Sequence, residues 1–173
     1  MPLVLNSSSI TGLAAVGGFS ARQTGEVLQV VSAVKTDRQT FSLTDNVYQD
    51  ITSLSVSITP SSSSSKILAL VTIGAIGASG VTDLLLRLIR GSTAIAIGDA
   101  GNTYLSAVAL RTNSAELNSS YSINFLDSPA TTSSTTYKVQ IASTGTYTAA
   151  INTRTSSSVF GAISTITLLE IAA

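Results

Sequence analysis

The chain of 173 residues is long enough for one domain, which would bury roughly 70% of its extended-chain surface. Its nine basic and nine acidic residues cancel, and charged residues make up only 10% of the chain, against about 25% in ordinary soluble domains. Cysteine and histidine are both absent. This excludes disulfides and thiol chemistry and removes the commonest general base and zinc ligand, so we expect no cofactor and no metal.

Several classes of partner are disfavoured as well. Basic residues do not cluster, so nucleic acid is not an expected partner. No positively charged segment precedes Leu3, Val4 and Leu5, so we expect no signal peptide. The longest apolar tract, residues 67–81, is interrupted by Gly, Ser and Thr, and it is shorter than the about 20 residues of a membrane span. Membrane insertion is therefore not expected.

Hydroxyl groups take the place of charges on the polar surface, since the chain has 29 Ser and 23 Thr. The mean hydropathy is +0.42. Solubility of a free monomer favours a net charge away from zero. We therefore expect an oligomer whose subunits meet over a large, mostly neutral surface.

Residues 1–25 differ from the rest. They are rich in Ser, Gly and Ala and show no regular period, and Gly12, Gly17 and Gly18 would break a helix. A purely solvated tail seldom carries many large apolar residues. The segment is therefore expected to be an extended arm that orders against a partner, rather than a free tail. Its interface residues would be Leu3, Val4, Leu5, Ile10, Leu13, Val16 and Phe19.

The first expected strands are residues 26–35 and 41–48, with a bend at Asp45–Asn46. Residues 51–73 follow and predict a hairpin. Its first arm alternates Leu54, Val56 and Ile58 with hydroxyl residues, which is typical of a strand with one buried face. Pro60 ends this arm, and residues 61–65 are all Ser and form the loop. The second arm, residues 67–73, is apolar at nearly every position, which predicts a strand in mid-sheet covered on both faces.

A glycine-rich connection is expected at residues 74–82. Gly91–Ser92 then predicts a two-residue turn between strands at residues 84–90 and 93–97. The remaining expected strands are residues 104–111, 117–126, 135–143, 147–151 and 163–171. Residues 163, 165, 167, 169 and 171 would share one face of the last strand.

This pattern predicts an all-β fold. No stretch shows a convincing 3.6-residue repeat, and about ten short strands alternate with turn residues. Such spacing is typical of an antiparallel β-sandwich, and a jelly-roll-like form suits a subunit of this size. We expect an extended N-terminal arm over residues 1–25 and a sandwich, which would also be the trimerisation domain, over residues 26–173.

The search for catalytic chemistry finds little. The carboxylate pairs Asp45/Asp50 and Asp83/Asp99 could form a glycosidase pair only if the fold brought them close. Residues 74–80 have the glycines of a nucleotide loop, but their spacing differs and no lysine is present. Asp99 and Asn102 are too few ligands for calcium. We expect no catalytic, cofactor-binding or metal-binding residue.

Arg87 and the tyrosines leave alternatives open. Arg87 lies among leucines, so it either faces outward on a half-exposed sheet or forms an ion pair with Asp83 or Glu170 of a neighbouring subunit. We keep it as a candidate interface residue. The five tyrosines either line a sugar-binding site by stacking or pack at the rim of the core with the hydroxyl in water. They are Tyr48, Tyr104, Tyr121, Tyr137 and Tyr147.

Seven short segments resemble, in their order along the chain, a module found in bacteriophage structural proteins, especially of cyanobacterial and marine phages. The segments are residues 26–31, 54–60, 66–68, 88–99, 124–129, 137–140 and 166–171. The resemblance covers about residues 26–173. It implies a virion surface protein, a β-sandwich and trimeric assembly, and the absence of His and Cys adds the expectation that the protein is not an enzyme. In many relatives the module ends a longer tail fibre, whereas this chain has no shaft repeats and no coiled-coil heptads.

Two functions follow from this resemblance. The first is a homotrimeric capsid decoration (cement) protein, assembled in the host cytoplasm, that binds the major capsid protein or another virion protein through its arm. An arm of 25 residues spans at most about 85 Å, which suits a contact across neighbouring capsomers. The alternative is a tail-fibre or receptor-binding tip that contacts a host-surface glycan. An enzyme acting through two carboxylates, such as a depolymerase, is disfavoured but not excluded.

Overall fold

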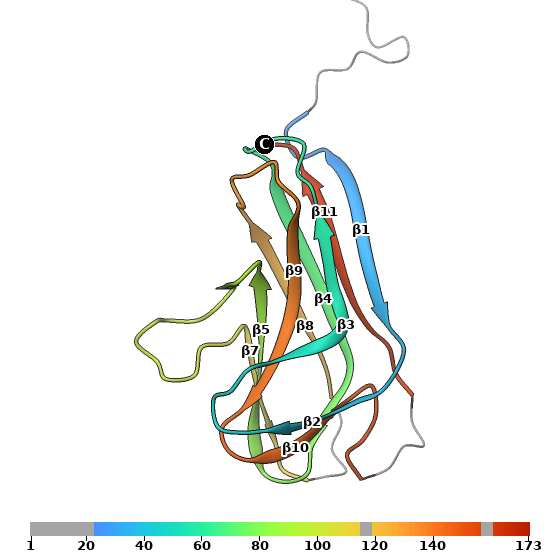
Figure 1. Cartoon of the computed structure of the whole chain (residues 1–173), viewed down its shortest axis with the longest axis vertical. Helices are drawn as coiled ribbons and strands as arrows, with labels where there is room; N and C mark the ends of the chain where they lie inside the picture. Colours follow the sequence, from blue (N-terminus) through green and yellow to red (C-terminus); the bar gives the residue numbers. More distant parts are fainter. Residues whose placement is uncertain (1–22, 115–118, 157–160) are drawn as a thin grey trace, which may run out of the picture.

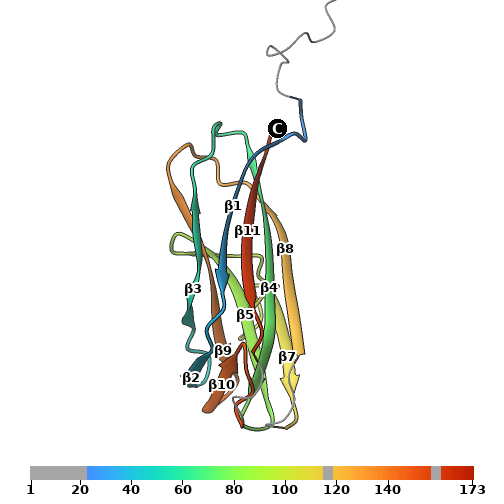
Figure 2. The same cartoon turned by 90° about the vertical axis from the view of Figure 1, so that its right-hand side faces the viewer.

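The computed structural model describes residues 23–114, 119–156 and 161–173, and all regular secondary structure in these residues is β. The described residues form eleven strands, whose arrangement is drawn in Figures 1 and 2. They are β1 (Val27–Lys35), β2 (Gln39–Leu43), β3 (Gln49–Ile58), β4 (Lys66–Ala78), β5 (Thr82–Arg90), β6 (Thr93–Ile95), β7 (Val108–Thr112), β8 (Ser119–Asp127), β9 (Thr135–Ser143), β10 (Tyr147–Ile151) and β11 (Ser164–Ile171). Most of this length falls within the strands that the sequence predicted.

The strands form two antiparallel sheets. The six-stranded sheet has the order β1-β11-β4-β10-β2, and β8 also pairs with β4, over residues 67–76. The five-stranded sheet has the order β3-β9-β5-β6, with β7 also paired to β5. Figure 2 shows β1, β11, β4 and β8 side by side, with β3 and β9 in the other layer. The antiparallel sandwich predicted from the sequence is confirmed.

The core lies between the two sheets. Leu54 and Ile58 of β3 and Val139 of β9 are at most 2% exposed, and they join Ile67 and Val71 of β4 in one buried cluster. Consecutive strands repeatedly pass from one sheet to the other, as from β3 to β4 and from β8 to β9, which gives the fold its jelly-roll-like character.

The expected hairpin over residues 51–73 is wrong. β3 pairs with β9 in the five-stranded sheet, whereas β4 pairs with β11, β8 and β10 in the six-stranded sheet. The loop of residues 59–65 therefore crosses between the sheets. Alternation shows which side chains of a strand face the core, but it does not show which strand is the partner.

The second arm, β4, is central in its sheet, as predicted. In the single chain, however, only one of its two faces is buried. Ile67, Ala69, Val71 and Ile73 are buried, while Leu70 on the opposite face is 37% exposed. The strand also continues to Ala78, through the expected glycine-rich connection.

Gly74 explains this continuation. A Cβ atom there would lie 2.0 Å from the carbonyl oxygen of Ile163, so only glycine allows the two backbones to come so close. The pairing of β4 with β8 also shifts register between Ile73 and Ile76. The glycines here permit an irregular strand rather than a loop.

Most of the other expected elements agree with the structure, but the strand expected at residues 41–48 is Gln39–Leu43 and the strand expected at 93–97 ends at Ile95. β5 and β6 form the predicted hairpin, with Gly91 at a positive φ of 59°. The strands at residues 135–143 and 147–151 have the expected bounds. The strand expected at 104–111 begins only at Val108. Residues 1–22, with all seven apolar arm residues, lie outside the described part, so the arm remains a prediction.

Candidate functional site

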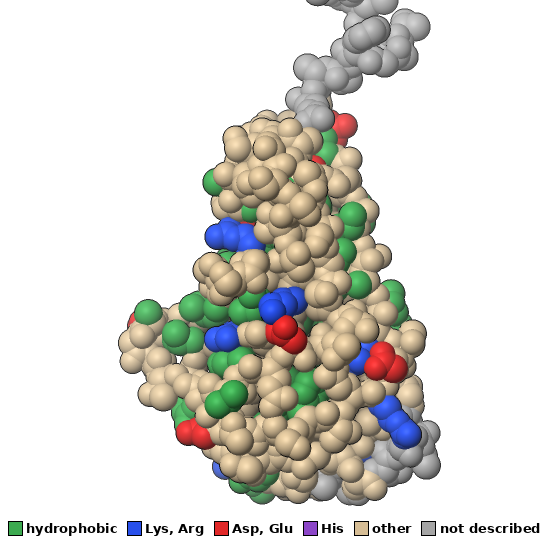
Figure 3. Space-filling model, viewed as in Figure 1, with side chains coloured by type: hydrophobic (Ala, Val, Ile, Leu, Met, Phe, Trp, Pro, Cys, Tyr) green, Lys and Arg blue, Asp and Glu red, His purple; other side chains and the backbone are tan. Residues whose placement is uncertain are grey.

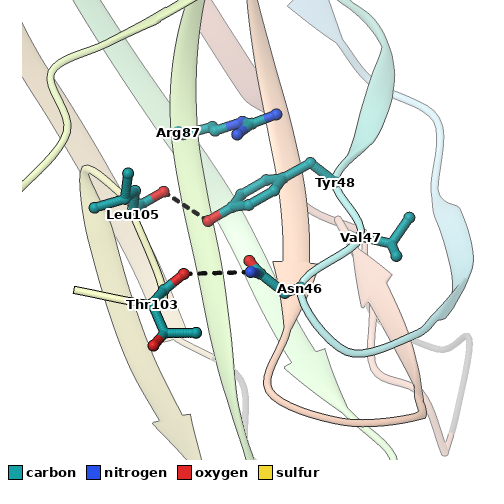
Figure 4. Close-up of a pocket in the computed structure, with 6 residues that line it drawn as sticks. All are labelled: Asn46, Val47, Tyr48, Arg87, Thr103 and Leu105. Atoms are coloured by element: carbon teal, nitrogen blue, oxygen red, sulfur yellow. Dashed lines mark hydrogen bonds between the residues drawn. The ribbon is translucent and has the colours of Figure 1, made fainter. Parts of the chain in front are cut away.

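A hollow of about 420 Å³ lies on the outer face of the five-stranded sheet (Figure 4). The segment before β3 forms one side, β5 contributes the floor, and the loop between β6 and β7 forms the other side. The hollow is lined by Asn46, Val47, Tyr48, Arg87, Thr103 and Leu105.

Arg87 stacks on Tyr48 within this hollow. The guanidinium carbon is 3.6 Å from the centre of the ring, a cation–π contact worth about 0.5–1 kcal/mol at an exposed site. Arg87 Nε also donates a hydrogen bond of 2.8 Å to Gln140 Oε1 on β9. These contacts fix the side chain over the sheet, which agrees with an outward-facing position.

The loop between β6 and β7 is held by polar contacts from the segment before β3. The Tyr48 hydroxyl donates to the carbonyl oxygen of Leu105 at 2.7 Å, and Asn46 Nδ2 donates to that of Thr103 at 3.2 Å. Tyr104 in turn donates to Asp45 at 3.0 Å. Burial raises the pKa of the Tyr48 hydroxyl, although the Arg87 charge opposes this shift. Tyr48 is thus a neutral hydrogen-bond donor that shapes the hollow.

Gln140 connects Arg87 to a charged pair. Its Nε2 donates to Asp50 at 2.6 Å, and Lys138 Nζ donates to the other Asp50 oxygen at 2.7 Å. The hydrogen bond from Lys138 is the main reason that the pKa of Asp50 is lowered. A lowered pKa keeps Asp50 ionised, which is the opposite of what a general acid requires.

The other carboxylates considered for a glycosidase pair are also engaged. Asp83 pairs with Arg111 at 3.2 Å, and Asp99 accepts from the backbone N–H of Gly101 within its own turn. In the described residues, no group of three or more acidic side chains could hold a metal ion. The same residues contain no helix that is long and apolar enough to span a membrane.

Three buried polar centres were missed by sequence reasoning. Asp127 pairs with Arg90 at 2.8 Å and accepts from the Tyr137 hydroxyl at 2.6 Å. Tyr137 is fully buried, and its pKa is raised by burial and by this hydrogen bond. The hydroxyl of Tyr137 is therefore not in water, and Asp127 is more than a turn residue. The signal that could have found this centre is a carboxylate in phase with the alternating apolar residues of β8.

Glu170 is the second centre. It is fully buried on β11 and accepts hydrogen bonds from Gln29 at 2.6 Å and from both the N–H and the hydroxyl of Ser61. Burial alone would raise the pKa of Glu170, but hydrogen bonds from Ser61, Gln29 and Ser65 lower it to about 2. The sequence left open an ion pair between Glu170 and a neighbour's Arg87, but the oxygens of Glu170 are already occupied within the chain.

The third centre is Asn152, a buried residue with a positive φ of 62°. Its Nδ2 donates to the carbonyl oxygens of Lys35 and Asp37, and its Oδ1 accepts from Ser164 at 2.7 Å. It therefore joins the β1–β2 turn to the start of β11. All three centres stabilise the sandwich rather than forming a reactive site.

No family model matches the chain, and no curated protein matches it in sequence. Solved structures of a virus do align with it. A chain from the infectious bursal disease virus Gx strain has 12% identity and a TM-score of 0.45, covering 99% of this chain and 47% of that one. Chains from T=1 particles derived from this virus and from its T13 particle have 12% and 13% identity and TM-scores of 0.42 and 0.39, each covering 95% of this chain and 40% of the other. This chain thus spans less than half the length of the structures it matches. Likeness of this degree does not assign a function.

The surface around the hollow has few charges (Figure 3). Some of the charged side chains on this face lie beside one of opposite sign and others stand apart, and hydrophobic side chains gather beside the projecting loop between β6 and β7. Arg87 is the one predicted interface residue that the structure describes, and it lies on this face. Its contact with a neighbouring subunit remains a prediction.

Proposed function

We propose that this protein is a structural protein of a bacteriophage virion: a homotrimeric capsid decoration protein without enzymatic activity. In this proposal it assembles in the host cytoplasm and lies on the virion surface, where it binds the major capsid protein through residues 1–25 and stabilises the shell. The sequence segments over residues 26–173 that resemble the phage module support the viral assignment. The β-sandwich is the fold that this resemblance implies.

The observation that carries the proposal is exposed apolar surface on a nearly uncharged molecule. Ten large hydrophobic side chains are 37–56% exposed among the described residues. Half of them lie on the six-stranded sheet. Such surface, without net charge to keep copies apart, is typical of a protein that is covered in an assembly. The residues are Val27, Val30, Val34, Val47, Leu70, Val81, Ile97, Tyr104, Leu126 and Ile163.

Deletion of residues 2–20 tests the role of the arm. We expect the truncated protein to keep its fold and oligomeric mass but to lose binding to phage particles stripped of the native protein, measured by co-sedimentation. A full-length variant with Leu3, Leu5 and Phe19 changed to Ser should behave like the deletion. The matched control changes Ser7, Ser8 and Ser9 to Ala and should bind normally. Decoration of particles by the deleted protein would refute the arm contact.

The hollow favours a second candidate, a tail-fibre or receptor-binding tip. An aromatic ring and a guanidinium beside an open hollow can bind a sugar ring and an acidic group of a host-surface glycan. If this second function is correct, the purified protein binds host cells or their polysaccharide, and Arg87→Ala abolishes that binding. Absence of binding by the intact protein would reject it. Any loss of polysaccharide chain length in the same assay would reveal an enzyme.

A further inference from the structure

The outer face of the six-stranded sheet carries a row of aliphatic side chains. Val30 of β1 lies opposite Leu169 of β11, Leu169 opposite Leu68 of β4, and Leu68 opposite Leu126 of β8. These four residues, the aliphatic row, cross four neighbouring strands in register (Figure 2). Val30 and Leu126 are 56% and 55% exposed. The row is therefore continuous and faces solvent in the single chain.

The rows on either side extend this surface and add a single charge, that of Lys66. Toward the end of the sheet where β1 begins, Val27 lies opposite Ile171. On the other side, Leu70 lies between Thr167 and Asn124. Lys66 is the one charged side chain on this face in the paired segments of these strands, and it donates to Ser128 at 2.8 Å. The face is thus apolar at its centre and bordered by small polar groups, as interface cores are.

The size of the face is sufficient for a specific contact. Four strands about 4.8 Å apart and about eight residues long cover roughly 19 Å by 26 Å, or about 500 Å² per copy. Two such faces in contact would bury about 1,000 Å², the lower limit for a specific interface. A peptide strand lying across the row would leave most of this area uncovered.

We propose that this face, centred on the aliphatic row, is the surface through which copies of this chain contact one another. A nearly uncharged face is complementary to itself, because apart from Lys66 it presents no charge that must be matched by a different partner. In the assembly the rows of neighbouring copies face one another and shield each other from water. This inference rests on the self-association in the proposed function and names the surface responsible.

The first test measures the mass of the full-length protein by light scattering and sedimentation equilibrium. Val30→Glu combined with Leu126→Glu places two charges in the row, and we expect it to raise the dissociation constant at least 100-fold. The matched control, Val47→Glu with Val81→Glu, changes two residues that are 52% and 50% exposed elsewhere, and it should keep the wild-type mass. Should the glutamate variant fail to fold by circular dichroism, Val30→Thr with Leu126→Thr replaces it, because threonine suits a strand.

The outcomes separate the two proposals. An assembled wild type whose mass survives the row substitutions overturns the interface and leaves the proposed function standing. A monomeric wild type overturns the homotrimer, and the interface with it.

A second test identifies the occupant of the face. The chain has no cysteine, so Leu126→Cys and Val81→Cys each introduce a single thiol for reaction with a maleimide. We expect the thiol at position 126 to react at least tenfold more slowly than the thiol at position 81, both in the full chain and after deletion of residues 2–20. Protection that disappears with the deletion while the mass is unchanged would show that the arm covers the row, and equal reaction rates would show that nothing does. Either result would overturn the proposal.

Discussion

The polar residues inside the sandwich are held by partners that lie far away in the sequence. Glu170 contacts Gln29 and Ser61, which are 141 and 109 residues away. Asp127 contacts Arg90 from another strand. A buried charge without partners would be strongly unfavourable. Each centre therefore fixes one arrangement of the strands, and its loss should reduce stability without affecting any chemistry.

The Asp127 centre gives the first prediction. Asp127→Asn should lower the free energy of unfolding by about 2–4 kcal/mol, because Arg90 and Tyr137 lose the carboxylate they share. Urea denaturation of the purified protein measures the change. Asp83→Asn is the matched control: its ion pair with Arg111 is exposed, so the cost should stay below about 1 kcal/mol. Equal costs at the two positions would contradict the role assigned to Asp127.

Glu170 gives a pH-dependent prediction. Its pKa in the folded chain is about 2, below the ordinary value of 4.5. Above pH 4.5 the carboxylate is ionised in both states, and its hydrogen bonds contribute fully to stability. As the pH falls from 4.5 toward 2 the unfolded chain takes up the proton first, so this contribution is progressively lost.

Glu170→Gln isolates the effect. At pH 7 the variant should be less stable by about 1–3 kcal/mol, because hydrogen bonds to a charged acceptor become bonds to a neutral one. Between pH 4.5 and 2 its stability should fall less steeply than that of the wild type. Unfolding in urea over this pH range measures both slopes. Parallel curves for the two proteins would show that Glu170 does not titrate as described.

At the scale of elements, the sequence predicted strands better than sheets. The Gly91–Ser92 turn located the β5–β6 hairpin, and the turn residues between apolar runs gave the bounds of β9 and β10. Pairing was not predictable, since β3 and β4 follow one another but lie in different sheets. The hollow was not predictable either, although Arg87 and Tyr48 were both noted, because the two residues lie on separate elements that only the fold brings together.

Gly74 allows a test of the close contact between β4 and the backbone of Ile163. Gly74→Ala would place a methyl group against the backbone of Ile163, and backbone cannot move aside as a flexible side chain does. The expected cost is about 1–3 kcal/mol or more, measured by thermal or urea unfolding. Gly98→Ala is the control, because nothing lies within 4 Å of the added Cβ. A tolerated alanine at position 74 would mean that β4 and the start of β11 are farther apart than described.

At the scale of the whole molecule, the two ways in which copies could associate respond differently to salt. An interface formed by the aliphatic row depends on apolar burial, whereas a contact between Arg87 and a neighbour's carboxylate depends on charge. The attraction between exposed charges decays over a screening length of about 10 Å at 0.1 M salt, so an exposed ion pair weakens as the salt concentration rises. Apolar burial is not weakened in this way, and sulfate strengthens it.

We therefore predict that the mass of the assembled protein is unchanged between 0.05 and about 1 M sodium chloride. The midpoint of thermal unfolding should rise with protein concentration, because assembly stabilises only the folded chain. The variant Val30→Glu with Leu126→Glu should lose this concentration dependence, while Arg87→Ala should keep it. Dissociation of the wild type at high salt, with loss of assembly in Arg87→Ala, would instead assign the contact to the face that carries the hollow. The measurement thus decides which of the two sheets faces the neighbouring copy and which remains free for a partner.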